Sequence, residues 1–244
     1  MADIPRIISV DDHVVEPPDL WTSRLPAKYH DRCPRVERDS AVFNFEGGEF
    51  TYQKGVPGGA ECDWWLYDDL VYPFPKLSAA SGFETLDVEP VTFDQIRPGG
   101  WKQADRLADM TANHVDASLC FPNVLPRFCG QTFLEREDKE LALLCVQAYN
   151  NWMIDEWCAG DARGRLIPLT LIPLWDPAAA ALEVHRCADK GSFAVAFSEN
   201  PYHLGLPSIH DKDRFWDPFL TACQETDTVV CMHIGSSSKM PTTS

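Results

Sequence analysis

The apolar positions of this chain gather in five short segments, each closed by Pro, Asn, Ser or Gly. Within each segment apolar residues occupy both alternating faces. This composition is typical of strands that are buried from both sides in a parallel sheet. The segments predicted as strands are residues 7–13, 115–121, 166–174, 193–197 and 228–234.

Helical periodicity occupies the stretches between these segments. Apolar side chains recur three and four residues apart along residues 135–157, which predicts a long amphipathic helix there. The dipeptide Asp-Pro occurs at residues 176–177 and again at 217–218, where it supplies an N-cap and a first-turn proline. The predicted helices are residues 103–113, 135–157, 177–190 and 219–226.

From residue 103 onward helices and strands alternate, which implies right-handed βα crossovers and the α/β class. Residues 14–102 separate the first predicted strand from this series and are rich in Pro, Gly, Trp and Tyr. We interpret them as one long insertion in the first βα loop of a single domain, residues 1–244, with a small hairpin over residues 41–52. Loops of this length are usually functional, so we expect a lid or a contact surface.

The composition of the chain limits the partners and the cellular location that we expect for this protein. The formal net charge is -16, which disfavours nucleic acid and anionic membrane surfaces and favours a small-molecule substrate. The start of the chain lacks a basic, apolar leader and no apolar run is long enough to span a membrane, so we expect a cytoplasmic protein. The nine cysteines include no C-x-x-C pair and are expected to be small buried residues.

The segment SVDDHVVEPP ends the first predicted strand with two carboxylates and an imidazole. Because side chains alternate along a strand, Asp11 and His13 point to one side and Asp12 to the other. By the same alternation Ile8 and Val10 point to the same side of the strand as Asp12, and they are expected to pack beneath the helices. An Asp-x-His pair at a strand end is able to hold one metal ion.

A second histidine, His233, ends the last predicted strand as His13 ends the first. Functional residues of a βα barrel gather at the carboxyl ends of its strands. One carboxylate and two imidazoles suit Zn²⁺, with Mn²⁺ or Fe²⁺ as alternatives. We therefore predict Asp11, His13 and His233 as metal ligands.

Longer motifs carry a family resemblance. In order along the chain they are ISVDDHVVEPPDLW, IRPGGWKQADRLADM, VDASLCFPN, GRLIPLTLIPLWDP, SENPYHLGLPSIHDKDRFWDPF and VVCMHIGSSS. Together they cover nearly the whole chain. The sequence resembles the amidohydrolase superfamily, and within it the amidohydrolase-related group that includes aminocarboxymuconate-semialdehyde decarboxylase and the resorcylate-type decarboxylases.

The resemblance implies a TIM-type (β/α)8 barrel that carries a divalent metal, usually zinc. Asp11 and His13 match the metal pair of the first barrel strand in such enzymes, and His233 matches the histidine that ends the fifth. The implied function is hydrolysis or non-oxidative decarboxylation of a small carboxylated or aromatic molecule. Relatives are commonly dimers or higher oligomers, so a homodimer is expected.

The resemblance is incomplete at the carboxyl terminus. Relatives continue to a histidine near the sixth strand and a proton-shuttling aspartate at the eighth, whereas this chain ends in SSSKMPTTS shortly after His233. We therefore expect an incomplete barrel of about five βα units, with catalytic residues beyond residue 244. The alternative to an enzyme is a truncated, non-catalytic fragment or paralogue.

Other polar residues lie where the predicted strands end or closely follow them. Glu16 comes soon after the metal motif and is a candidate for orienting His13 from outside the coordination sphere. Strand ends also carry ordinary caps, so each position has a structural alternative. The candidate substrate-binding residues are Asn123, Trp175, Glu199, Asn200 and His203.

Overall fold

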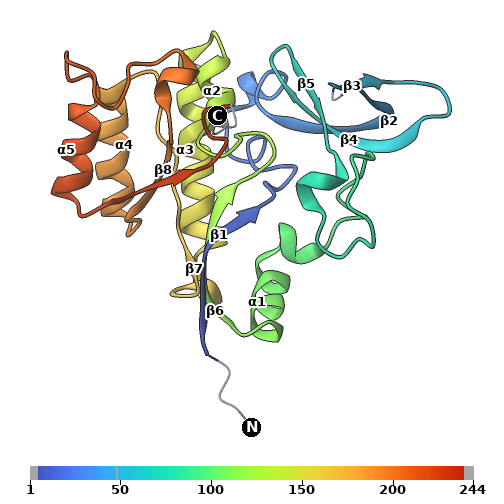
Figure 1. The fold of residues 1–244 in the computed structure, drawn as a ribbon, viewed down its shortest axis with the longest axis horizontal. Helices are drawn as coiled ribbons and strands as arrows, with labels where there is room; N and C mark the ends of the chain where they lie inside the picture. Colours follow the sequence, from blue (N-terminus) through green and yellow to red (C-terminus); the bar gives the residue numbers. More distant parts are fainter. Residues whose placement is uncertain (1–4, 48, 239–244) are drawn as a thin grey trace.

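The computed structural model describes residues 5–47 and 49–238 (Figure 1). The strands are β1 (Ile7–Val14), β2 (Arg35–Glu46), β3 (Glu49–Lys54), β4 (Ala60–Tyr67), β5 (Leu70–Pro73), β6 (Val115–Pro122), β7 (Leu166–Ile167), β8 (Ala194–Ser198) and β9 (Val229–His233). The α-helices are α1 (Gln103–Ala112), α2 (Gln131–Glu135), α3 (Lys139–Trp152), α4 (Pro177–Asp189) and α5 (Asp217–Glu225).

Parallel strands form two small sheets, in the orders β1-β6-β7 and β8-β9. A bridge between Thr170 and Val195 links the two sheets, so the strands follow one another as the alternation of elements predicted. β7 is much shorter than the predicted strand over residues 166–174. Pro168 and Pro173 have no backbone N–H, which removes two ladder donors from this segment. The described strands are mixed with helices as expected for an α/β fold, but they do not close into a barrel.

The outward faces of the first and last parallel strands differ from the prediction. Ile8 and Val10 were expected to pack beneath helices, yet they are 63% and 66% exposed. Val229 and Met232 of β9 are also largely exposed, at 61% and 50%. Within the described residues β1 pairs only with β6 and β9 only with β8, so each strand leaves one edge free.

The long insertion is more regular than the sequence indicated. It contains a four-stranded antiparallel sheet in the order β3-β2-β4-β5, seen at the right of Figure 1. The hairpin expected over residues 41–52 is present as β2 and β3, but β4 and β5 were missed. The reason is that both faces of β4 are buried: Trp65 joins the main core while Trp64 joins a separate small cluster, so polar and apolar residues do not alternate.

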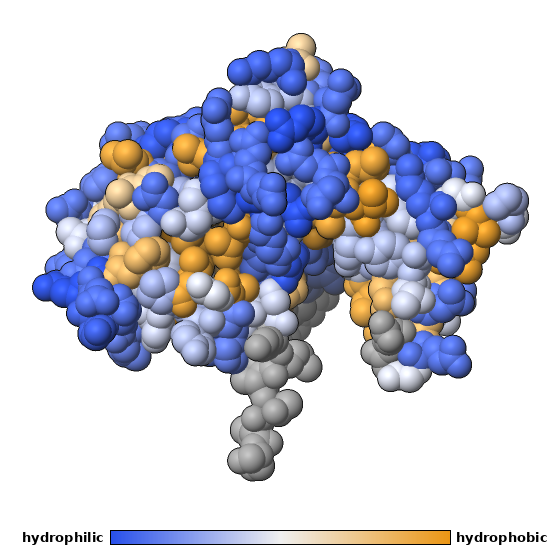
Figure 2. Space-filling model, turned by 90° about the horizontal axis from the view of Figure 1, so that it is seen from above, coloured by the Kyte–Doolittle hydropathy of each residue, from blue (hydrophilic) through white to orange (hydrophobic). Residues whose placement is uncertain are grey.

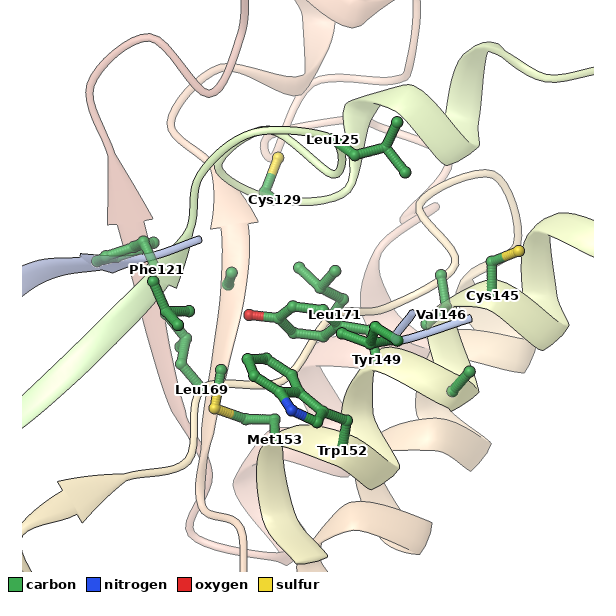
Figure 3. Close-up of a cluster of buried hydrophobic side chains, with 14 of the residues drawn as sticks. Phe121, Leu125, Cys129, Cys145, Val146, Tyr149, Trp152, Met153, Leu169 and Leu171 are labelled. Carbon is green, nitrogen blue, oxygen red and sulfur yellow. The ribbon is translucent and has the colours of Figure 1, made fainter. Parts of the chain in front are cut away.

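The helix predicted over residues 135–157 begins later, as α3, and continues after Trp152 as a π-helical turn over Met153–Trp157, while α2 is a separate short helix before it. α3 begins where the Asp138 side chain accepts a hydrogen bond from the backbone N–H of Leu141, at 3.0 Å. Its inner face supplies Tyr149 and Trp152 to the main core, together with Leu171 from the segment after β7 (Figure 3). All nine cysteines are free, and eight are buried, in agreement with the sequence.

Glu16 joins the end of β1 to the end of β6. Its carboxylate is fully buried and accepts hydrogen bonds from three consecutive backbone N–H groups: Asn123 at 2.8 Å, Val124 at 3.1 Å and Leu125 at 3.3 Å. Burial raises the pKa of Glu16 from 4.5 to about 7, because a charged carboxylate loses its hydration there, and the N–H groups offset only part of this effect.

The raised pKa of Glu16 predicts a pH dependence of stability. Since the folded-state pKa lies above the ordinary value, the contribution of Glu16 is most favourable below pH 4.5 and is lost as the pH rises to about 7. Relative to Glu16→Gln, the free energy of unfolding of the wild type should fall by about 3 kcal/mol over this interval. Urea unfolding at several pH values would measure it, and parallel curves for both proteins would contradict it.

Candidate metal centre

Asp11, His13 and His233 come together at the carboxyl ends of β1 and β9. Each offers one ligand atom, and these three atoms lie within 4.8 Å of one another. The two imidazole rings have their centroids 5.0 Å apart, although their strands do not pair in the described structure. This grouping brings together the three residues that the sequence predicted as metal ligands, two from the first strand and one from the last.

The ring of His233 is oriented by contacts on both of its nitrogens. Nδ1 lies 2.6 Å from the carbonyl oxygen of Ile234, and Nε2 lies 3.1 Å from Oδ1 of Asp11. A hydrogen bond from Nδ1–H to a backbone carbonyl selects the tautomer whose Nε2 carries a free lone pair. The Nε2 lone pair and the Asp11 carboxylate are therefore close enough to bind the same metal ion. The side chain of Asp11 is 70% exposed.

His13 has the properties of a neutral ligand. Burial and, second, the neighbouring His233 lower the pKa of His13, so its imidazole is uncharged near neutral pH. Its Nδ1 is buried and has no hydrogen-bond partner among the described residues. Arg106 fixes the backbone of His13 by donating from Nη2 to its carbonyl oxygen at 2.7 Å. A neutral, unpartnered nitrogen beside a carboxylate and a second imidazole fits a divalent metal such as zinc.

Asp12 points away from this group, as strand alternation predicted. Its carboxylate accepts a short hydrogen bond from Ser118 Oγ on β6 and lies 3.8 Å from Nη1 of Arg106 on α1. The register of β1 against β6 shifts between Ser9 and Asp12, which marks an irregularity beside the site. Bulges of this kind commonly re-aim side chains next to functional sites.

Two phenylalanines pack around the histidines and were missed at the sequence level. Phe128, which is half-buried, lies on the ring of His233 with centroids 4.3 Å apart and on the edge of His13 at 5.3 Å. Phe121 approaches His233 at 5.1 Å from the end of β6. Gly235 adopts a φ of 85°, and its Cα faces the ring of Phe128. The motif VDASLCFPN contained Phe121, but no periodicity marks Phe128.

The other candidate residues make mainly structural contacts. The Asn123 amide donates to the Ser78 carbonyl of the insertion, and Lys139 lies 5.0 Å above the Trp175 ring. Asn200 precedes a short 3₁₀ turn, and His203 lies within it. The substrate-binding roles of these four residues stay predictions.

Glu199 fastens the turn that follows His233. Its carboxylate accepts hydrogen bonds from the Gly235 backbone N–H at 3.2 Å and from the hydroxyl groups of Ser236 and Ser237. Burial acts to raise the pKa of Glu199, but the two hydroxyl groups and the backbone hydrogen bonds outweigh it, so that this pKa is lowered. Glu199 therefore stays ionised and connects the end of β8 to the end of β9.

The surface of the protein is mainly hydrophilic on the face shown in Figure 2. Separate hydrophobic patches lie between the hydrophilic side chains. In the part of the chain that the structure describes, no helix is both long and apolar enough to cross a membrane.

Comparison with solved structures identifies the fold. Amidohydrolase map2389c from Mycobacterium avium subsp. paratuberculosis K-10 superimposes with a TM-score of 0.61 and 22% sequence identity over 96% of this chain. The chain spans 60% of the length of that protein. A search of curated proteins finds no significant match.

A family model provides the remaining evidence. The model described as amidohydrolase matches residues 62–244, which is most of the chain. The match includes His233 but begins after Asp11 and His13, so the position of those two ligands rests on the geometry given above. The chain belongs to the amidohydrolase family.

Proposed function

We propose that this chain is a metal-dependent hydrolase that acts on a small molecule at the Asp11, His13 and His233 group. The observation that carries the proposal is the convergence of one ligand atom from each of these three residues within 4.8 Å. In addition, the buried Nδ1 of His13 has no hydrogen-bond partner among the described residues. Three protein ligands with an open fourth position are typical of catalytic zinc. Mn²⁺ and Fe²⁺ remain alternatives with the same donors.

The chemistry follows from this donor set. A divalent metal held here would polarise a substrate oxygen and lower the pKa of a coordinated water to about 7. The neutral His13 and the oriented Nε2 of His233 would bind it, while the exposed carboxylate of Asp11 marks the side from which substrate enters. Phe121 and Phe128 keep water from the faces of the imidazoles.

Non-oxidative decarboxylation of an aromatic acid is a second candidate. The specific observation in its favour is the half-buried ring of Phe128, which offers a stacking surface beside the ligand group. Hydrolysis and decarboxylation both begin with a substrate oxygen held at the same three ligands, so the product distinguishes them.

A non-catalytic role is the alternative outside the enzyme class. The specific observation in its favour is that, among the described residues, β1 and β9 each pair on one edge only. In that case the three ligands would bind metal without catalysing a reaction.

The ligand assignment predicts a clear difference between neighbouring carboxylates. His13→Ala and His233→Ala should each lower metal affinity by more than about tenfold, because each removes one of three donors. Asp11→Asn should weaken binding, whereas Asp12→Asn should leave it unchanged because Asp12 binds Ser118 and Arg106 instead. Elemental analysis of the purified proteins measures how much metal each variant retains. One metal equivalent retained in both histidine variants would exclude the site.

The reaction type can be tested with the metal-loaded protein. We expect hydrolysis of small esters, lactones or amides without release of CO₂, and activity at the metal-free background in His233→Ala. Carbon dioxide release from an aromatic carboxylic acid would favour decarboxylation. Full metal occupancy with neither product from a broad substrate panel would favour the non-catalytic alternative.

A further inference from the structure

The segment between β6 and α2 covers the ligand group from one side. We define this segment as the 123–130 loop. It begins at the residues that bind Glu16 and carries Phe128, whose ring packs on both histidines. The conformation of this loop therefore decides whether the imidazoles are shielded.

The loop contains a constrained turn. Arg127 adopts a φ of 58°, in the left-handed region that non-glycine residues rarely occupy. A conformation of this kind persists only when surrounding contacts hold it. The Arg127 guanidinium donates to Glu135 at 2.6 Å, and the thiol of Cys129 donates to the Ser236 carbonyl at 3.6 Å.

The strongest of these contacts is at the start of the loop. Three backbone N–H groups converge on the one carboxylate of Glu16, which is fully buried, whereas Arg127 and Phe128 are partly exposed. Glu16 also follows His13 by only three residues, so it connects one ligand strand directly to the loop that covers both histidines.

We propose that Glu16 is a positioning residue that holds the 123–130 loop so that Phe128 packs on His233 and fixes its imidazole for metal binding. The metal part of this inference rests on the function proposed above. In the part of the chain that the structure describes, Glu16 forms no hydrogen bond with His13 and acts through the backbone of residues 123–125. Replacement by Gln keeps the shape but presents an NH₂ group to backbone donors, so part of the cluster is left without an acceptor.

The first experiment needs no metal. The ring of Phe128 lies close to His233, so its ring current shifts the imidazole proton resonances of that histidine. Nuclear magnetic resonance of histidine-labelled, metal-free protein above pH 7 should show this shift in the wild type and lose it in Glu16→Gln, together with faster amide exchange at residues 123–125. An unchanged His233 resonance in folded Glu16→Gln would overturn the proposal.

The second experiment measures metal affinity. Titration with Zn²⁺ or Co²⁺ should give about tenfold weaker binding for Glu16→Gln and for Phe128→Ala. The double variant should bind no more weakly than Phe128→Ala alone, because both changes remove the same contact. Full additivity of the two effects would contradict the route through Phe128.

A matched control separates positioning from general loss of stability. Glu183 is another buried carboxylate, paired with Arg186 and Asn150 between α4 and α3. Glu183→Gln should lower stability without changing the His233 resonance or metal affinity. If Glu16→Gln does not fold, Phe128→Ala still decides the matter: wild-type affinity in that variant would refute the proposal.

The two experiments distinguish failure of the proposed function from failure of the positioning role. A wild-type chain that binds no metal, but whose His233 resonance depends on Glu16, would refute the metal-dependent function and retain the positioning role. Metal binding that disappears in His233→Ala but is unaffected by Glu16→Gln would retain the function and refute the positioning role.

Discussion

The carboxyl ends of β1 and β9 meet although the two strands do not pair in the described structure, and the candidate site depends on this convergence. Neighbouring strands lie about 4.8 Å apart, so a flat row from β1 through β6, β7 and β8 to β9 would separate its ends by about 19 Å. The histidine rings are 5.0 Å apart instead. The row of strands must therefore curl, which turns two distant strand ends into one ligand group.

The curl is supported by a core that the insertion shares with the βα units. The indole N–H of Trp21 donates to the Cys145 carbonyl of α3 at 3.0 Å, and Trp65 of β4 packs edge-on against Trp21 at 5.6 Å. Moving the whole insertion would expose these fully buried rings. We therefore expect any lid motion to be confined to the outer hairpin of β2 and β3.

Two carboxylates, the fully buried Glu16 and the half-buried Glu199, organise the backbone around the site without joining the ligand group. Glu16 collects N–H groups at the end of β6, and Glu199 collects one N–H and two hydroxyl groups after β9. Each fixes the loop that carries a residue of the site. Asp11 is different because its carboxylate is mostly exposed and faces His233, which leaves it available to a cation.

The sequence by itself determined the alternation of helices and strands, the Asp-Pro helix start at 176–177 and the side of β1 on which Asp11 and His13 lie. These features are local, because they depend on periodicity, capping and strand alternation. Tertiary structure decided the rest. Both faces of β4 are buried, so its strand had no readable alternation, and the position of Phe128 depends on contacts with Glu16 and Ser236 that lie more than 100 residues away. The short distance between His233 and His13 depends on the curl of the row of strands. No local sequence pattern predicts this curl.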